Sequence, residues 1–178
     1  MNTFSLTHLK GPQGDDNTPG LLGYVLVARE DAFSKIAKAP KTGTTAGETA
    51  IITDNHTFTN ADDGFAKVYL TLDSNMLKAA ITGERDGRGL KISFEGFHPG
   101  NNAEALEFMR IVKNLGLIIL VPDADGTYLQ VGAEGLPVEF APDYDSGKLS
   151  SGRRGFTVKG EAYANGMYIY AGTVKYKA

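Results

Sequence analysis

Apolar and polar residues alternate along most of the chain, with the period of two that is typical of a strand with one buried face. Glycine, proline, asparagine and aspartate separate the alternating stretches, because turns between strands favour these residues. The stretches predicted to be strands or hairpins are 21–30, 50–59, 65–74, 75–84, 89–97, 117–131, 136–142 and 154–178. The pattern therefore predicts a mainly β protein, folded as an antiparallel β-sandwich or barrel.

The middle of the chain shows this alternation most clearly. Between residues 65 and 74 the predicted core face is the even-numbered set, Ala66, Val68, Leu70 and Leu72. Two further alternating stretches follow, joined by a turn with Asp86–Gly87 at its centre, and aspartate followed by glycine is a strong hairpin signal. We expect residues 65–97 to form an antiparallel meander of three strands.

One segment, at about residues 102–115, departs from the period of two. Its apolar residues recur at helical spacing and form a broad face, made of Ala105, Leu106, Phe108, Met109, Val112 and Leu115. Asn101 or Asn102 can cap the first turn, since an asparagine side chain accepts a bond from an unpaired N–H there. Gly116 supplies a left-handed stop. The sequence predicts one flanking α-helix whose apolar face covers an open side of the β core.

The connections are long and polar in three places. Residues 1–20 are rich in glycine, proline, aspartate and asparagine, and are expected to be a flexible N-terminal arm. Residues 31–49 and 143–155 are expected to be loops, and loops longer than about 12–15 residues are usually functional or disordered. No linker or repeat divides the chain, so residues 1–178 are expected to form a single domain.

Composition narrows the class of function. The formal net charge is −3, which does not provide the dense basic surface that non-specific nucleic-acid binding needs. Cysteine is absent, so disulfides, thiolate nucleophiles and cysteine-ligated metals are excluded. The longest apolar run, Leu117–Val121, is far shorter than the ~20 residues that span a bilayer, and residues 1–20 lack the apolar core of a signal peptide. We expect a protein made in the cytoplasm without a membrane anchor.

Candidate catalytic and metal-binding residues are few. His8, His56 and His98 lie far apart, and no two of them have zinc-site spacing; His98, in the turn before the helix, is expected to bond to backbone. Residues 123–126 (DADG) begin like a calcium loop, but its later ligands are missing, which favours a hairpin turn. A phosphate-binding loop and a nucleophile elbow are also absent. The sequence predicts a protein that is not an enzyme and uses no cofactor or metal.

Several strands carry apolar residues on both faces. Residues 117–121 (LIILV) are apolar throughout, and residues 167–176 (MYIYAGTVKY) are rich in tyrosine. A strand with two apolar faces must be covered on both. We expect the second cover to be the helix or another subunit.

The order of these features resembles that of phage tail tube proteins and their relatives in contractile injection systems and type VI secretion tubes. The resemblance covers about residues 21–178. It is carried by residues 64–109 and by residues 117–164, where a strand leads to DGTYLQVG, then SGK, then a strand that ends in GEAYA. It implies a virion structural protein whose subunits form stacked rings, commonly hexameric, around a conduit for DNA.

The resemblance also implies partners and contacts. The partners are further copies of the chain and other tail proteins such as a tape measure or terminator, with DNA only as transient cargo in the lumen. The loops at 31–49 and 143–155 would reach neighbouring subunits, and the candidate contact residues within them are Phe33, Ile36, Pro40, Tyr144, Lys148, Arg153 and Arg154.

Other functions stay open at this point. A terminator, head–tail adaptor or baseplate protein can share the fold of a tail tube subunit. A β-sandwich module that binds carbohydrate is a further alternative, although the chain has no tryptophan for a sugar platform. A small β-barrel enzyme is the third, and it lacks a catalytic constellation.

Overall fold

The computed structural model describes residues 6–178. The chain is mainly β, and in this part it contains one α-helix, α1 (Ala103–Val112). The strands are β1 (Tyr24–Arg29), β2 (Phe33–Lys35), β3 (Ile51–Ile52), β4 (Thr57–Phe58), β5 (Ala66–Tyr69), β6 (Met76–Thr82), β7 (Gly89–Pro99), β8 (Gly116–Pro122), β9 (Tyr128–Val131), β10 (Val138–Phe140), β11 (Asp143–Asp145), β12 (Gly155–Ala164) and β13 (Tyr168–Tyr170). Two short 3-10 helices, η1 and η2, lie at Glu30–Ala32 and Glu48–Ala50.

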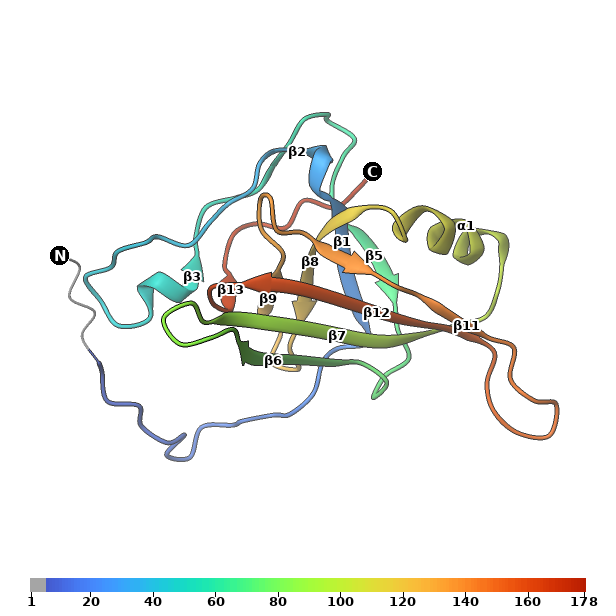
Figure 1. Cartoon of the computed structure of the whole chain (residues 1–178), viewed down its shortest axis with the longest axis horizontal. Coiled ribbons are helices and arrows are strands. Elements are labelled where there is room, and N and C mark those ends of the chain that lie inside the picture. Colours follow the sequence, from blue (N-terminus) through green and yellow to red (C-terminus); the bar gives the residue numbers. More distant parts are fainter. Residues whose placement is uncertain (1–5) are drawn as a thin grey trace.

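Strand β8 lies at the centre of one large sheet. One of its edges pairs with β1, which pairs in turn with β5. Its other edge pairs with β9 and β10; β10 leads on to β12, β7 and β6, while β9 leads to β13 and β3. Figure 1 shows β6, β7 and β12 crossing in front of the steeper strands β1, β5, β8 and β9. The sheet therefore folds over itself into two layers, as expected for a β-sandwich.

The curled sheet comes close to closing where β5 ends beside β7. The backbone N–H of Thr71 donates to the carbonyl of Phe97 at 2.8 Å. On β12, Gly160 lies between Phe140 of β10 and Phe94 of β7, which pair with it from either side. A side chain at Gly160 would lie 2.7 Å from the ring of Phe140. Its absence lets the two rings approach each other over β12, with centroids 6.3 Å apart.

The space between the layers is filled by aliphatic and aromatic side chains, which we call the inner cluster. Its buried members are Val25, Val27, Leu70, Ile92, Phe94, Val112, Leu117, Ile119, Val121, Val131, Val138, Phe140, Val158 and Ala162. They come from both layers and from the end of α1. Burial of this apolar surface is the main source of the stability of the fold.

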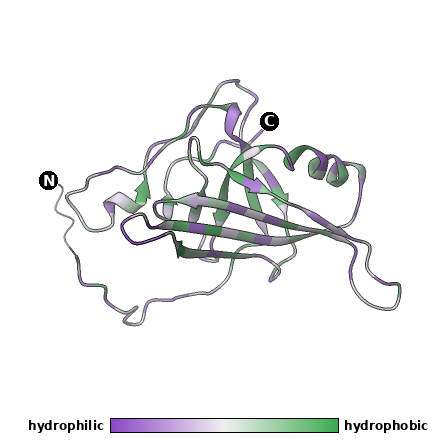
Figure 2. Ribbon diagram, in the orientation of Figure 1, coloured by the Kyte–Doolittle hydropathy of each residue, from purple (hydrophilic) through white to green (hydrophobic). Residues whose placement is uncertain are grey.

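A second cluster covers the opposite face of β1 and β8, and we call it the outer cluster. Its buried members are Leu26, Ala28, Ile36, Ala37, Ile52, Phe65, Ile118, Leu120 and Tyr170. The cover consists of the segments around β2, β3, β4 and β13, so the apolar second face of β8 is buried by its own chain. The expectation that the helix or another subunit covers this face is wrong. Figure 2 shows the apolar residues gathered on the central strands.

The helix forms where it was predicted, but it is shorter. It begins after Asn102, whose side-chain oxygen accepts a bond from the Ala105 N–H at 2.9 Å, and it ends at Val112 rather than near residue 115. Ala105 and Val112 are buried, whereas Leu106 is half exposed. Leu106 was predicted to lie on the buried face, and that prediction is wrong because the helix contacts the sheet along a narrower stripe.

Three further predictions need correction. Strand β5 pairs with β1 and not with β6, so residues 65–97 do not form a three-stranded meander, although β6 and β7 do form a hairpin. The predicted loop at 143–155 begins with β11, which pairs with β12. The predicted loop at 31–49 contains β2, and a 3-10 helix overlaps each of its ends. In each case a short segment finds pairing partners that lie far away in the sequence or beyond the loop.

The N-terminal arm lies apart from the sheet. Leu6 to Gly20 contain neither helix nor strand, and every residue in this stretch is exposed. Figure 1 shows this segment leaving the body below the sheet and extending toward the end opposite to α1. The first five residues of the predicted arm lie outside the described residues.

Candidate functional site

The outer edge of β6 is the longest free edge of the sheet. β6 is seven residues long and pairs only with β7 within the described part of the chain. Its residues are exposed except for Leu77. Unpaired N–H and C=O groups along such an edge are a template for pairing with another strand.

An apolar surface runs from the inner cluster out to this edge. Leu77 and Leu90 are half-buried against the inner cluster. Ile81 lies directly opposite Leu90 and is 72% exposed. Residues paired directly opposite each other share a face of the sheet. The inner face therefore stays apolar beyond the point where the chain covers it.

The candidate contact residues of the first loop have different surroundings. Phe33 is half-buried and stacks on Phe58, with ring centroids 4.4 Å apart. Ile36 is buried in the outer cluster, and Pro40 is exposed. Of these three, Pro40 presents the most open surface.

The candidate contact residues of the second loop are all exposed. Tyr144 leans on Phe156, with ring centroids 5.1 Å apart, and the guanidinium of Arg153 lies 3.7 Å from the centre of the Phe97 ring. Lys148 lies in the turn after β11, and the carbonyl of Arg154 accepts a bond from the Gly100 N–H. Figure 1 shows this loop far from β2. The structure thus places the predicted residues in two separate groups.

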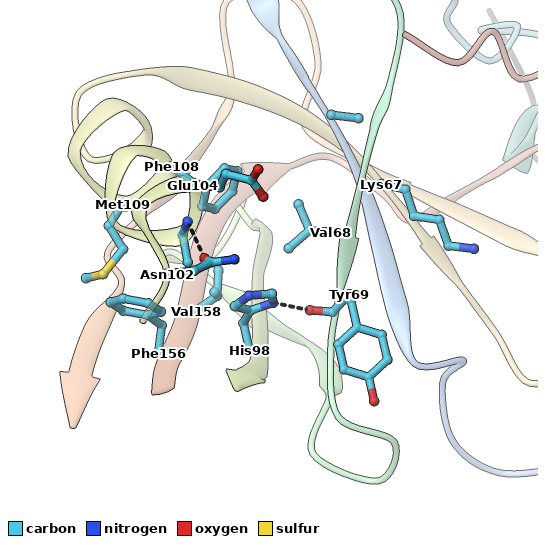
Figure 3. Close-up of a pocket in the computed structure, with 12 residues that line it drawn as sticks. Lys67, Val68, Tyr69, His98, Asn102, Glu104, Phe108, Met109, Phe156 and Val158 are labelled. Atoms are coloured by element: carbon cyan, nitrogen blue, oxygen red, sulfur yellow. Dashed lines mark hydrogen bonds between the residues drawn. The ribbon is translucent and has the colours of Figure 1, made fainter. Parts of the chain in front are cut away.

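A groove that sequence reasoning missed lies between β5 and α1 (Figure 3). Its cavity volume is about 340 Å³. The wall is mostly apolar and comes from β5, α1 and β12, with Ala66, Val68, Ala105, Phe108, Met109, Phe156 and Val158 as its apolar residues. His98, Asn102 and Glu104 contribute polar side chains, whereas the Lys67 side chain points away from the groove. No pattern within one segment could have revealed this groove, because three distant elements form it.

His98 lines this groove. It is the second-last residue of β7 and does not lie in the predicted turn. Its Nδ1 lies 2.8 Å from the carbonyl oxygen of Tyr69. A carbonyl can only accept, so Nδ1 carries the proton and donates it. The bond to backbone is the one expected from the sequence, and it ties the end of β7 to β5.

His56 is the buried polar residue that sequence reasoning left in a turn. It is 6% exposed, its Nδ1 accepts a bond from the Ala37 N–H at 3.0 Å, and its ring stacks on Tyr170 at 4.5 Å. Burial lowers the pKa of His56 to about 4. At neutral pH it is therefore an uncharged member of the aromatic packing beneath the outer cluster. The sequence did contain a signal for this burial: His56 is an even number of residues from the apolar residues Ile52 and Phe58, and a period of two places such residues on one face.

Residues 6–178 contain no group of three or more histidine, cysteine, aspartate or glutamate side chains placed to hold a metal ion. Within the same residues, no helix has the length and apolar character needed to cross a membrane. The ion pairs found there join exposed side chains, such as Lys38 with Glu134 at 2.6 Å, and exposed pairs of this kind add little to stability.

The surfaces described above offer apolar side chains and backbone groups as points of contact. The free edge of β6, the loop after β11 and the groove beside α1 lie on different elements. The chain matches no protein-family model, no curated protein and no solved structure.

Proposed function

We propose that this protein is a virion structural protein, the subunit of a phage tail tube that assembles as stacked hexameric rings around a conduit for DNA. It acts by assembly and not as an enzyme. Its partners are further copies of itself and other tail proteins, such as a tape measure or terminator. Its place is the virion tail.

The observation that carries the proposal is the free edge of β6 with its apolar inner face. A seven-residue edge strand with Ile81 72% exposed on its inner face is a surface that monomeric proteins normally shield. Pairing this edge with a strand of a neighbouring subunit would satisfy its backbone groups and cover the side chain of Ile81. A contact between two different surfaces, repeated by a rotation that returns to its starting point, forms a closed ring.

Charge is compatible with a conduit. The formal net charge is −3, and a mildly acidic protein does not retain the phosphate backbone of DNA as a basic lumen would. The loops at 31–49 and 143–155 are proposed to reach neighbouring subunits or the next ring. Their exposed residues Pro40, Tyr144, Lys148, Arg153 and Arg154 are the candidates for those contacts.

Electron microscopy of negatively stained protein, together with light scattering, tests the proposal. The unmodified chain should form rings or tubes at high concentration. Ile81→Lys should abolish them, because a charge would then lie on the apolar inner face that the contact is proposed to cover. Glu84→Gln changes the net charge by the same amount in the turn after β6 and should leave assembly intact.

A strictly monomeric chain at high concentration would overturn the proposal. A monomer with a saturable sugar ligand would support the carbohydrate-binding alternative instead. Closed rings that never stack would favour a terminator, head–tail adaptor or other connector over a tube subunit.

A further inference from the structure

The outer edge of β5 has a gap in its hydrogen bonding at Lys67. Residues of an antiparallel strand bond alternately to one neighbour and to the other. The Leu70 N–H donates to the carbonyl of Gly23 at 2.9 Å, so Val68 and Ala66 also bond toward β1. The backbone N–H and C=O of Lys67 therefore point away from β1. No second strand pairs with β5 on that side in the described part of the chain.

The positions on either side of this gap are occupied. The Phe65 N–H donates to the carbonyl of Lys175 at 2.9 Å, and the carbonyl of Tyr69 accepts a bond from His98 at 2.8 Å. The gap at Lys67 opens beside the apolar groove (Figure 3). A short extended segment could bond to the backbone there and direct a side chain into the cavity, as in recognition by strand addition.

The N-terminal arm complements the groove in its apolar and charged side chains. Leu6 is 100% exposed and Leu9 is 96% exposed, although leucine is among the residues most often buried. His8 and Lys10 flank Leu9, and Glu104 lies on the rim of the groove. An apolar side chain next to a positive charge on the arm thus matches an apolar cavity next to a negative charge.

We propose that the groove between β5 and α1 binds the N-terminal arm of a second copy of this chain. Leu9 enters the cavity, the arm backbone bonds to Lys67, and Lys10 faces Glu104. The arm belongs to another copy because Leu6–Gly20 runs beneath its own sheet toward the end opposite to α1 (Figure 1). The inference rests on the proposed self-association and names one contact within it.

Disulfide trapping tests this contact cleanly because the chain has no cysteine of its own. Two single variants, Leu9→Cys and Met109→Cys, are purified separately, mixed and oxidised. A disulfide forms only where Cα atoms come within about 7 Å. The mixture should give a cross-linked heterodimer. That band should be lost when Met109→Cys is replaced by Leu149→Cys, since Leu149 is fully exposed away from the groove.

A second groove variant is needed in case Met109→Cys fails to fold. Glu104→Cys lies on the exposed rim and should also cross-link to Leu9→Cys. Absence of a heterodimer with both groove variants, or an equal yield with Leu149→Cys, would overturn the inference. So would cross-linking only within single chains of the double variant Leu9→Cys/Met109→Cys. Rings that form without this cross-link would contradict the arm contact alone. A chain that stays monomeric would contradict the proposed function as well.

Discussion

Strands β6 and β8 are both seven residues long and both carry apolar side chains, yet their surroundings are opposite. β8 is paired along both edges and buried from Leu117 to Pro122. β6 is paired along one edge, and only Leu77 is even half-buried. The more apolar of the two strands is the one that the chain satisfies by itself. Apolar sequence therefore indicates a partner only where the fold leaves it exposed.

The contrast comes from what covers each strand. In β8 the side chain of Ile119 enters the inner cluster while Ile118 and Leu120 enter the outer cluster. β6 lies at the far end of the sheet, where the inner cluster thins out and nothing in the described part of the chain pairs with its outer edge. The free energy of the fold thus depends on β8, whereas β6 is available for contacts between subunits.

The largest effect is expected from shortening a side chain of β8. Ile119→Ala should lower the free energy of unfolding by about 3–4 kcal/mol, because Ile119 is fully buried and the lost methyl groups leave a cavity. Urea denaturation followed by circular dichroism measures it. Ile119→Val, the milder change at the same position, should cost about 1 kcal/mol. A loss below about 1 kcal/mol for the alanine variant would contradict the central role of β8.

A smaller loss of stability is expected at acid pH, where His56 becomes protonated. His56 lies among the side chains that cover the outer face of β8. The folded pKa of His56 is about 4, below the ordinary value of 6.5, so protons bind more tightly to the unfolded chain. Stability from this group is complete above pH 6.5 and declines as the pH falls toward 4. The loss should reach about 2–3 kcal/mol.

Unfolding free energies measured between pH 7 and pH 4 check this expectation. The variant His8→Gln, at an exposed position of the arm, is the histidine control for the pH dependence of stability. His56→Gln should flatten that dependence. A wild-type chain as stable at pH 4 as at pH 7 would refute the buried, neutral state of His56.

Local patterns predicted the elements of the fold better than their pairing. The helix and its Asn102 cap, the β8–β9 hairpin and the mainly β class were predictable, because capping, turn chemistry and periodicity are local. The predicted left-handed stop at Gly116 is wrong, because Gly116 has no positive φ and is already the first residue of β8. The pairing of β5 with β1 was not, because strand partners depend on which faces meet in space. Leu72 shows the same limit: it continues the alternation of β5 but is 68% exposed, since the strand ends at Tyr69.

The candidate surfaces were predictable only in part. Sequence placed contact residues in loops because loops are long and polar, and the structure leaves Arg153 and Lys148 exposed but buries Ile36. The groove beside α1 needs three elements from distant parts of the chain, so no single stretch could reveal it. The exposed edge of β6 was hidden for a similar reason, since alternation alone does not say which strand lies last in the sheet.

The smallest effect is expected from a truncation in β6 itself. Ile81→Ala removes the same atoms as Ile119→Ala, but Ile81 is 72% exposed in the single chain. The free energy of unfolding of the dissociated chain should change by less than about 0.5 kcal/mol, as is usual for surface positions. Urea denaturation at low protein concentration measures this change, and the same titration at high concentration should show a clear loss of stability from weakened assembly. A loss above about 1.5 kcal/mol in the dissociated chain would mean that Ile81 belongs to the core, and β6 would then resemble β8 rather than oppose it.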